Sequence, residues 1–318
     1  MKHSVVFAVV VGMGALACVS STRQKPVSTT NASAVVASAT ATLATGQRRP
    51  TEMAVDATHV YWTTTSSSSD QRYDVLRVAK RGGPVETLAT DQSDAVGLTM
   101  DGTHVYWLAR TGECVARRIA KTGGPVATIA SGLPCSGGWA TTQAVVDDTR
   151  FYWTGDGGVR AVAKSGGTPA VVAEARSATL LVQDATKIYW GEANGPLWAQ
   201  SKSGGAKVKL LEASPARAAV DGSSLYYASA GKIMRLAKAG GAPVVLGPSG
   251  GRGEQAISVN DGFVFWTDVV DDQIRRLPVH GDIAAETLVA GERASSLFVD
   301  ASGTYYVATS GAVRRHAM

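Results

Sequence analysis

The chain has 318 residues, of which 45% are hydrophobic and 18% are charged, so it can bury a large apolar core and lacks the composition of a disordered protein. Its net charge is only +5, and the sequence has neither a Lys/Arg-rich run nor a basic stripe interleaved with aromatic residues, which gives nucleic-acid binding little support. Many of its 35 glycines lie between short apolar runs, a pattern typical of many strands joined by tight turns.

Residues 1–17 have the pattern of an export signal peptide. Lys2 supplies a positive start, residues 5–16 are largely apolar, and small residues precede Cys18. This apolar run is too short for a permanent transmembrane anchor. Its removal would lower the net charge from +5 to +4.

The end of this segment, Ala15-Leu16-Ala17-Cys18, resembles the bacterial lipoprotein signal, in which the cysteine after a small residue is lipidated. The resemblance implies that Cys18 carries a lipid that ties the protein to a membrane. Leu16 stands one place later than the leucine of that pattern, so ordinary cleavage is the alternative. Residues 18–37, rich in Ser, Thr and Ala, are predicted to be the lipidated cysteine and a disordered tether.

Beyond the tether, variants of one phrase, Asp-x-Thr-x-Val-Tyr-Trp, recur seven times at intervals of 37 to 46 residues. The copies begin at Asp56, Asp101, Asp147, Asp184, Asp221, Asn260 and Asp300. A period near 40, with short strands and tight turns, is typical of a β-propeller. The sequence therefore predicts one all-β domain over residues 38–318, a seven-bladed β-propeller of four-stranded blades, with six blades as the alternative.

The repeated residues are interpreted as structural. An aspartate at this place accepts backbone hydrogen bonds in a turn, and a run that is apolar on both sides suits a strand sandwiched between blades. Metal ligands and a sugar-binding aromatic platform are the alternatives. The residues concerned are Asp56, Asp101, Asp147, Asp184, Asp221, Asp300, Trp62, Trp107, Trp153, Trp190 and Trp266.

A second phrase, Lys-x-Gly-Gly, follows the third expected strand of five repeats and predicts a hairpin turn. Its lysines are Lys80, Lys121, Lys164, Lys202 and Lys238. Strand alternation places these turns and the aspartate turns on one face of the ring and the variable loops on the other. One hypothesis is that the lysines face anionic lipid, and the alternative is a solvated ring of surface lysines.

The seventh repeat ends at Met318 without room for a fourth strand. Residues 41–45, Ala-Thr-Leu-Ala-Thr, match residues 86–90, Glu-Thr-Leu-Ala-Thr, which form the fourth strand of the first repeat. The N-terminal strand is therefore predicted to complete the last blade in a "velcro" closure, which removes the open edge.

Two cysteines remain after Cys18, and both lie in insertions of the second repeat. In an oxidising compartment, Cys114 and Cys135 are predicted to form a disulfide, with two buried free thiols as the alternative. The region offers too few Cys and His ligands for a zinc site.

Specificity is expected in the variable loops, because a repeated scaffold cannot supply it. The candidate binding residues are Tyr73, Trp139, Asp156, Glu192, Arg252, Glu254, Asp268 and Asp271. Trp139 lies outside the repeat pattern, which favours binding, with local packing as the alternative. Asp268 and Asp271 could hold Ca²⁺, but their spacing does not match an EF-hand, and a solvated charged loop is more common. We predict no metal and no cofactor.

Phe265-Trp266-Thr267-Asp268 resembles the repeat of the YWTD class of propellers, and the Lys-x-Gly-Gly-x-Pro pattern resembles exported bacterial propellers, including NHL-like and TolB-like ones. The resemblance covers residues 38–318. It implies the fold and the binding of proteins, glycans or peptides, without a shared catalytic set. YWTD domains usually have six blades, so seven repeats depart from that class.

The sequence thus predicts a monomeric, non-enzymatic binding or scaffolding protein of the cell envelope, with an envelope protein or glycan as partner. It would be an outer-membrane or cell-surface lipoprotein, or else periplasmic or secreted. One alternative is a secreted enzyme of the streptogramin-lyase or lactonase type, and another is an outer-membrane protein assembly factor. The enzyme is disfavoured because the histidines, His59, His104, His280 and His316, are not expected to converge.

Overall fold

The computed structural model describes residues 39–65, 73–110, 113–134, 142–250 and 254–318, and the propeller unit extends from Ser38 to Met318. The expected signal peptide, Cys18 and the tether lie outside the described residues, so the interpretation of residues 1–37 stays a prediction. The described part contains no helix with the length and apolarity needed to cross a membrane.

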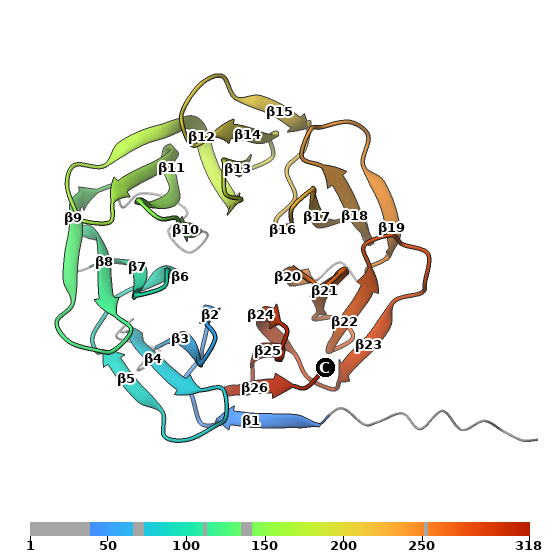
Figure 1. Ribbon diagram of the computed structural model, residues 1–318, viewed down its shortest axis with the longest axis horizontal. Coiled ribbons are helices and arrows are strands. Elements are labelled where there is room, and N and C mark those ends of the chain that lie inside the picture. Colours follow the sequence, from blue (N-terminus) through green and yellow to red (C-terminus); the bar gives the residue numbers. More distant parts are fainter. Residues whose placement is uncertain (1–38, 66–72, 111–112, 135–141, 251–253) are drawn as a thin grey trace, which may run out of the picture. The chain divides into compact units, whose positions relative to one another are not determined.

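Blades one and two are four-stranded antiparallel sheets, as the repeats predict (Figure 1). Their strands are β2 (Met53–Val55), β3 (His59–Thr65), β4 (Tyr73–Ala79) and β5 (Glu86–Ala89), then β6 (Val96–Met100), β7 (His104–Arg110), β8 (Cys114–Ala120) and β9 (Ala127–Leu133).

Blades three and four are joined in one six-stranded sheet. Its strands are β10 (Ala144–Val146), β11 (Arg150–Ala163), β12 (Ala170–Gln183), β13 (Lys187–Glu192), β14 (Leu197–Ser201) and β15 (Val208–Leu211). Strand β11 folds back on itself, because the N–H of Lys164 donates to the carbonyl of Thr149 at 2.9 Å. Gly157 and Gly158, with φ of 81° and 125°, permit this reversal. Strand β12 then pairs with β11 through its first half and with β13 through its second half, so it serves both blades.

Blades five and six are again four-stranded, and the N-terminal strand closes blade seven. Their strands are β16 (Ala218–Val220), β17 (Ser224–Ser229), β18 (Lys232–Ala237), β19 (Val244–Pro248), β20 (Glu254–Asn260), β21 (Phe263–Asp268), β22 (Gln273–Pro278), β23 (Glu286–Ala290), β24 (Ala294–Asp300), β25 (Gly303–Ala308), β26 (Ala312–His316) and β1 (Thr40–Ala44). Strand β1 runs antiparallel to β26, with Thr40 opposite His316, which confirms the "velcro" closure.

The seven blades form a closed ring around a central axis (Figure 1), and the space along that axis is called the central channel below. Because β11 and β12 each fill two strand positions, the 26 strands make seven sets of four. The innermost strands are β2, β6, β10, the second half of β12, β16, β20 and β24, and each contacts the next, with β24 contacting β2. The seven-bladed prediction is confirmed, and the six-bladed alternative is wrong.

The apolar core lies in the seams between blades. Each of seven hydrophobic clusters joins the residue at the Tyr position of one blade with the residue at the Trp position of the next. The pairs are Tyr61 with Trp107, Tyr106 with Trp153, Tyr152 with Trp190, Tyr189 with Tyr227, Tyr226 with Trp266, Phe265 with Tyr306, and Tyr305 with Trp62. Adjacent strand residues point to opposite faces of a sheet, so the Tyr-Trp dipeptide of each blade packs in the seams on both sides of that blade.

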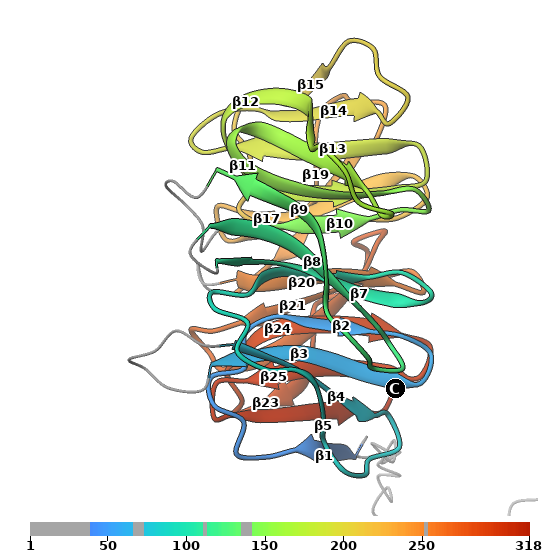
Figure 2. The same cartoon turned by 90° about the vertical axis from the view of Figure 1, so that its left-hand side faces the viewer.

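Figure 2 shows the blades edge-on, with their strands running between the two faces of the ring. The aspartate turns and the Lys-x-Gly-Gly turns share one face, since the N–H of Lys80 donates to the carbonyl of Thr58 at 2.8 Å and the other repeats follow the same pattern. We call this the aspartate face. The opposite face, where β3 leads to β4 and each blade leads to the next, is the variable-loop face.

Candidate functional site

The repeat aspartates build the turns of the aspartate face. Oδ1 of Asp101 accepts hydrogen bonds from the N–H groups of Thr103 and His104, at 2.7 and 2.8 Å, while Oδ2 accepts the hydroxyl of Tyr106 at 2.8 Å. The same three bonds recur at Asp56, Asp147, Asp184 and Asp221. These carboxylates therefore have a structural role, spread around the ring.

The lysines of the second phrase bind the aspartates of neighbouring blades. In each case Nζ approaches Oδ2 of the preceding blade's repeat aspartate, and four of the five distances lie between 2.6 and 3.4 Å. The pairs are Lys80 with Asp300, Lys121 with Asp56, Lys164 with Asp101, Lys202 with Asp147, and Lys238 with Asp184. The lysine side chains are only 10–22% exposed, so they form neither a lipid-facing ring nor a solvated one.

These contacts shift the titration of the turn carboxylates. Burial alone would raise their pKa, but the hydrogen bonds from the turn N–H groups, the tyrosine and the lysine outweigh it. The pKa of Asp147 is lowered to about 2, and those of Asp56, Asp101 and Asp184 are lowered further. The carboxylates stay ionised at neutral pH, which suits ion pairs that hold blades together.

The predicted binding residues that the structure describes lie at the variable-loop ends of several blades and do not form one cluster. Trp139 and Arg252 lie outside the described residues. Tyr73 begins β4, Asp156 lies in β11 and Glu254 begins β20, and only their backbones are described. Asp271 is exposed in the turn between β21 and β22.

Two of these candidates have local structural partners. Asp268 is only 2% exposed, and its Oδ1 accepts the N–H groups of Val270 and Asp271 at 3.1 and 3.2 Å. Oε1 of Glu192 accepts the indole N–H of Trp198 at 2.8 Å. Asp268 therefore shapes the turn that presents Asp271 and does not itself belong to an exposed surface.

The predicted disulfide would join the variable-loop end of blade two to a segment outside the described residues. Cys114 is fully buried at the start of β8, opposite Leu133 of β9. Cys135 follows shortly after β9 and is not described, so the Cys114–Cys135 bond stays a prediction.

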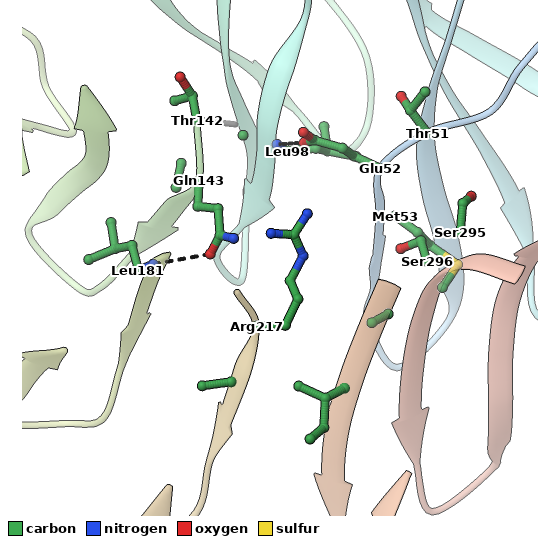
Figure 3. Close-up of a pocket in the computed structure, with 15 residues that line it drawn as sticks. Thr51, Glu52, Met53, Leu98, Thr142, Gln143, Leu181, Arg217, Ser295 and Ser296 are labelled. Atoms are coloured by element: carbon green, nitrogen blue, oxygen red, sulfur yellow. Dashed lines mark hydrogen bonds between the residues drawn. The ribbon is translucent and has the colours of Figure 1, made fainter. Parts of the chain in front are cut away.

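A cavity of about 300 Å³ occupies the central channel, and all seven innermost strands line it (Figure 3). Its walls include Thr51, Met53, Thr142, Ala218 and Ser295, which stand at or beside the starts of these strands. The starts of the innermost strands point to the variable-loop face, because the same strands end at the aspartate turns. The cavity therefore lies toward that face of the ring.

Glu52 contributes a carboxylate to the wall from the residue just before β2. The adjoining strand holds it, since the N–H of Thr63 donates to the carbonyl of Glu52 at 3.1 Å. Its Oε2 accepts the N–H of Leu98 across the seam to blade two. Burial raises the pKa of Glu52, whereas the N–H groups of Leu98 and Gly97 and the charge of Arg217 oppose that rise.

Arg217 and Gln143 enter the cavity from other blades, and Figure 3 shows the guanidinium of Arg217 between Gln143 and Glu52. Nη1 of Arg217 donates to the carbonyl of Ala216 at 3.0 Å. Oε1 of Gln143 accepts the N–H of Leu181 at 3.0 Å, and the backbone N–H of Gln143 donates to Thr154 Oγ1 at 2.9 Å. Leu181 of the next blade thus orients the side-chain amide.

Sequence reasoning missed these three residues, although a signal for them exists. The place four residues before the repeat Asp or Asn carries Glu52, Gly97, Gln143, Leu180, Arg217, Ala256 and Ser296. The place after it carries Met53, Leu98, Ala144, Leu181, Ala218, Ile257 and Leu297. An aligned column that varies in charge beside an apolar one indicates positions that need not pack in the core. All members of the first column except Leu180, which packs in the core, line the cavity.

None of the described histidines lines the cavity. His59 and His104 adjoin aspartate turns, His280 lies in the turn after β22, and Nδ1 of His316 is 3.0 Å from Thr40 Oγ1. Across the described ranges, no group of three or more His, Cys, Asp or Glu residues is arranged to hold a metal ion.

No protein-family model matches the sequence, and neither does a curated protein. Solved structures do match. YCF48 bound to D1 peptide is 12% identical, covering 88% of this chain and 95% of that one, with a TM-score of 0.65. The computationally designed protein Ika8 is 14% identical, covering 87% and 98%, with a TM-score of 0.61. BamB from Moraxella catarrhalis is 15% identical, covering 85% of each chain, with a TM-score of 0.59. The geometry and these likenesses together make this chain a β-propeller protein.

Proposed function

We propose that the protein is a non-enzymatic binding protein of the cell envelope, which holds a partner protein or glycan on its variable-loop face. The observation that carries this proposal is the difference between the two faces. On the aspartate face the repeat carboxylates and lysines bind one another. The variable-loop face carries the non-repeating turns and the cavity with Glu52 and Arg217.

The envelope location rests on the export signal and on Cys18, whose lipid would anchor the tether to an outer membrane or cell surface. Two of the solved neighbours are complexes, which supports a binding role: YCF48 with D1 peptide, and nidogen with laminin at 17% identity and a TM-score of 0.53. Propeller folds serve many functions, so the argument depends on the site.

Capture of partners from an envelope extract by the mature, tethered protein tests the proposal. The matched variants reverse one exposed charge on each face of the same blade: Asp271→Arg in the turn after β21, and Asp282→Arg in the turn after β22. We expect Asp271→Arg to weaken capture of a specific partner and Asp282→Arg to leave it unchanged. Equal capture by both variants and the unaltered protein, or loss only with Asp282→Arg, would contradict the use of the variable-loop face.

Metal analysis of the same purified protein distinguishes the enzyme alternative. A stoichiometric Ca²⁺, Zn²⁺ or Mg²⁺ ion whose retention depends on Glu52 would favour a lyase or lactonase over a binding protein. We expect no stoichiometric metal.

A further inference from the structure

The channel cavity carries a second inference, which goes beyond the binding of a macromolecular partner. A volume of about 300 Å³ is at the lower end of small-molecule pockets and is far too small for a folded protein. Its residues come from all seven blades, so the cavity lies at the centre of the ring.

Of the described residues that line the cavity, two are charged, and they carry opposite charges. Glu52 precedes β2 and Arg217 precedes β16, and these blades are as far apart as two blades of seven can be. No ion pair joins the two residues, although the positive charge of Arg217 acts on the Glu52 carboxyl. The cavity therefore has a carboxyl group on one wall and a guanidinium on another, and a ligand cation beside Glu52 would offset the effect of burial and favour its ionised form.

Neutral side chains add further constraints on a ligand. Because Gln143 Oε1 accepts the N–H of Leu181, its amide nitrogen is turned toward the Arg217 side of the cavity (Figure 3). Ser296 adds a hydroxyl on another wall. Apolar surface comes from Met53, Leu98, Leu181 and Ile257.

We propose that this cavity binds a small zwitterion, an apolar α-amino acid, with its ammonium at Glu52 and its carboxylate at Arg217. The amide nitrogen of Gln143 donates to the carboxylate, and the apolar residues cover the ligand's side chain. An anion alone would meet the carboxylate of Glu52 and a cation alone the guanidinium of Arg217, and like charges placed together in a site oppose binding. A molecule with both charges matches both walls.

Calorimetric titration of the mature protein with L-leucine tests this proposal. N-acetyl-L-leucine lacks the ammonium and L-leucine amide lacks the carboxylate, while both keep the apolar side chain. We expect L-leucine to bind and each derivative to bind at least about tenfold more weakly, because each loses one of the two charge contacts that L-leucine makes.

Two variants test whether the ligand binds in the cavity. Glu52→Gln keeps an oxygen for the N–H of Leu98 and should remove the preference for L-leucine over its N-acetyl derivative. Arg217→Gln should remove the preference over the amide. Glu286→Gln, an exposed change on β23, should alter neither. Thermal unfolding of each variant shows whether it has folded.

No heat of binding from folded protein at millimolar L-leucine would overturn the proposal. So would equal affinity for all three compounds, which would indicate a merely apolar cavity, or a preference that Glu52→Gln and Arg217→Gln leave intact. These results are independent of partner capture by the variable-loop face, which the Asp271→Arg and Asp282→Arg pair tests separately.

Discussion

Nζ of Lys164 lies 2.7 Å from Oδ2 of Asp101 in the preceding blade, and the hydroxyl of Tyr106 donates to the same oxygen at 2.8 Å. One carboxylate oxygen therefore joins a turn, a core tyrosine and a neighbouring blade. Tyr106 in turn packs in the same seam as Trp153 of that neighbouring blade. The ion pair thus covers the apolar core of the seam on the aspartate face.

Asp101→Asn should destabilise the protein more than the same change at Asp221. The asparagine amide cannot accept both the lysine and the tyrosine, so we expect a loss of about 1–3 kcal/mol in the free energy of unfolding. Asp221 has the same turn bonds and Tyr226, but Val279 takes the lysine position in the next blade. Urea unfolding measures both variants, and equal losses would contradict a contribution from Lys164.

The converse change, a lysine in place of Val279, should add an ion pair between two blades. Val279→Lys places an ammonium beside Asp221, and we expect it to be more stable than Val279→Met by a few tenths of a kcal/mol at low salt. The methionine variant matches the apolar stem without the charge. A difference that persists unchanged in high salt would show that the effect is not electrostatic.

Stability should fall at both extremes of pH. The turn aspartates have folded pKa values below the ordinary 3.8, with Asp147 at about 2, so their contribution is present above pH 4 and is lost as the pH falls toward 2. Burial, with Asp147, raises the pKa of Tyr152 to about 12, so its contribution is present below pH 10 and is lost as the pH rises through 12.

Urea unfolding at a series of pH values measures how the free energy of unfolding changes with pH. Asp147→Asn should reduce the loss of stability at acid pH, and Tyr152→Phe should reduce the loss at alkaline pH. If neither variant changes these losses, other groups control the pH dependence.

The N-terminal strand should be needed for a stable ring. Leu43 of β1 is 8% exposed and packs in the cluster that contains Trp62 and Tyr305, so Leu43→Asp should cost about 3 kcal/mol or more. Thr42→Asp, an exposed change on the same strand, is the control. Thermal unfolding compares them, and similar melting temperatures would refute closure by β1.

The Cys114–Cys135 bond should stabilise the ring by about 3 kcal/mol, as expected for a closed loop of this size. Cys114→Ser, Cys135→Ser and the double variant should lose similar amounts, since each breaks the same bond. Peptide mass mapping without reductant should find the cross-linked pair. Alkylation of both thiols in unreduced, unfolded protein would rule the bond out.

The repeat made the fold predictable because each copy carries its own turn aspartate and its own aromatic pair. Pairings between copies were not predictable in the same way. Lys164 and Asp101 are 63 residues apart, and each recurs so regularly that spacing alone does not show which lysine meets which aspartate. Sequence reasoning therefore placed both on one face and still assigned the lysines to lipid or solvent.

The channel residues were missed for the opposite reason. Glu52 and Arg217 each occur in one blade only, directly before short apolar strands, so a search for repeated motifs does not find them. Asp268 was misjudged because a carboxylate in a charged loop looks exposed, whereas this one accepts the N–H groups of its own turn. The burial of Asp268 arises only when the turn has folded, so the sequence alone does not show it.

Hydrogen–deuterium exchange of the mature protein, alone and with its captured partner, tests the central claim most directly. We expect slower exchange at the variable-loop face, in the turns at 192–196, 268–272 and 290–293. Exchange should not change at the aspartate turns, residues 56–58, 101–103 and 147–149. Protection of the aspartate turns with no change at the variable-loop face would contradict the account.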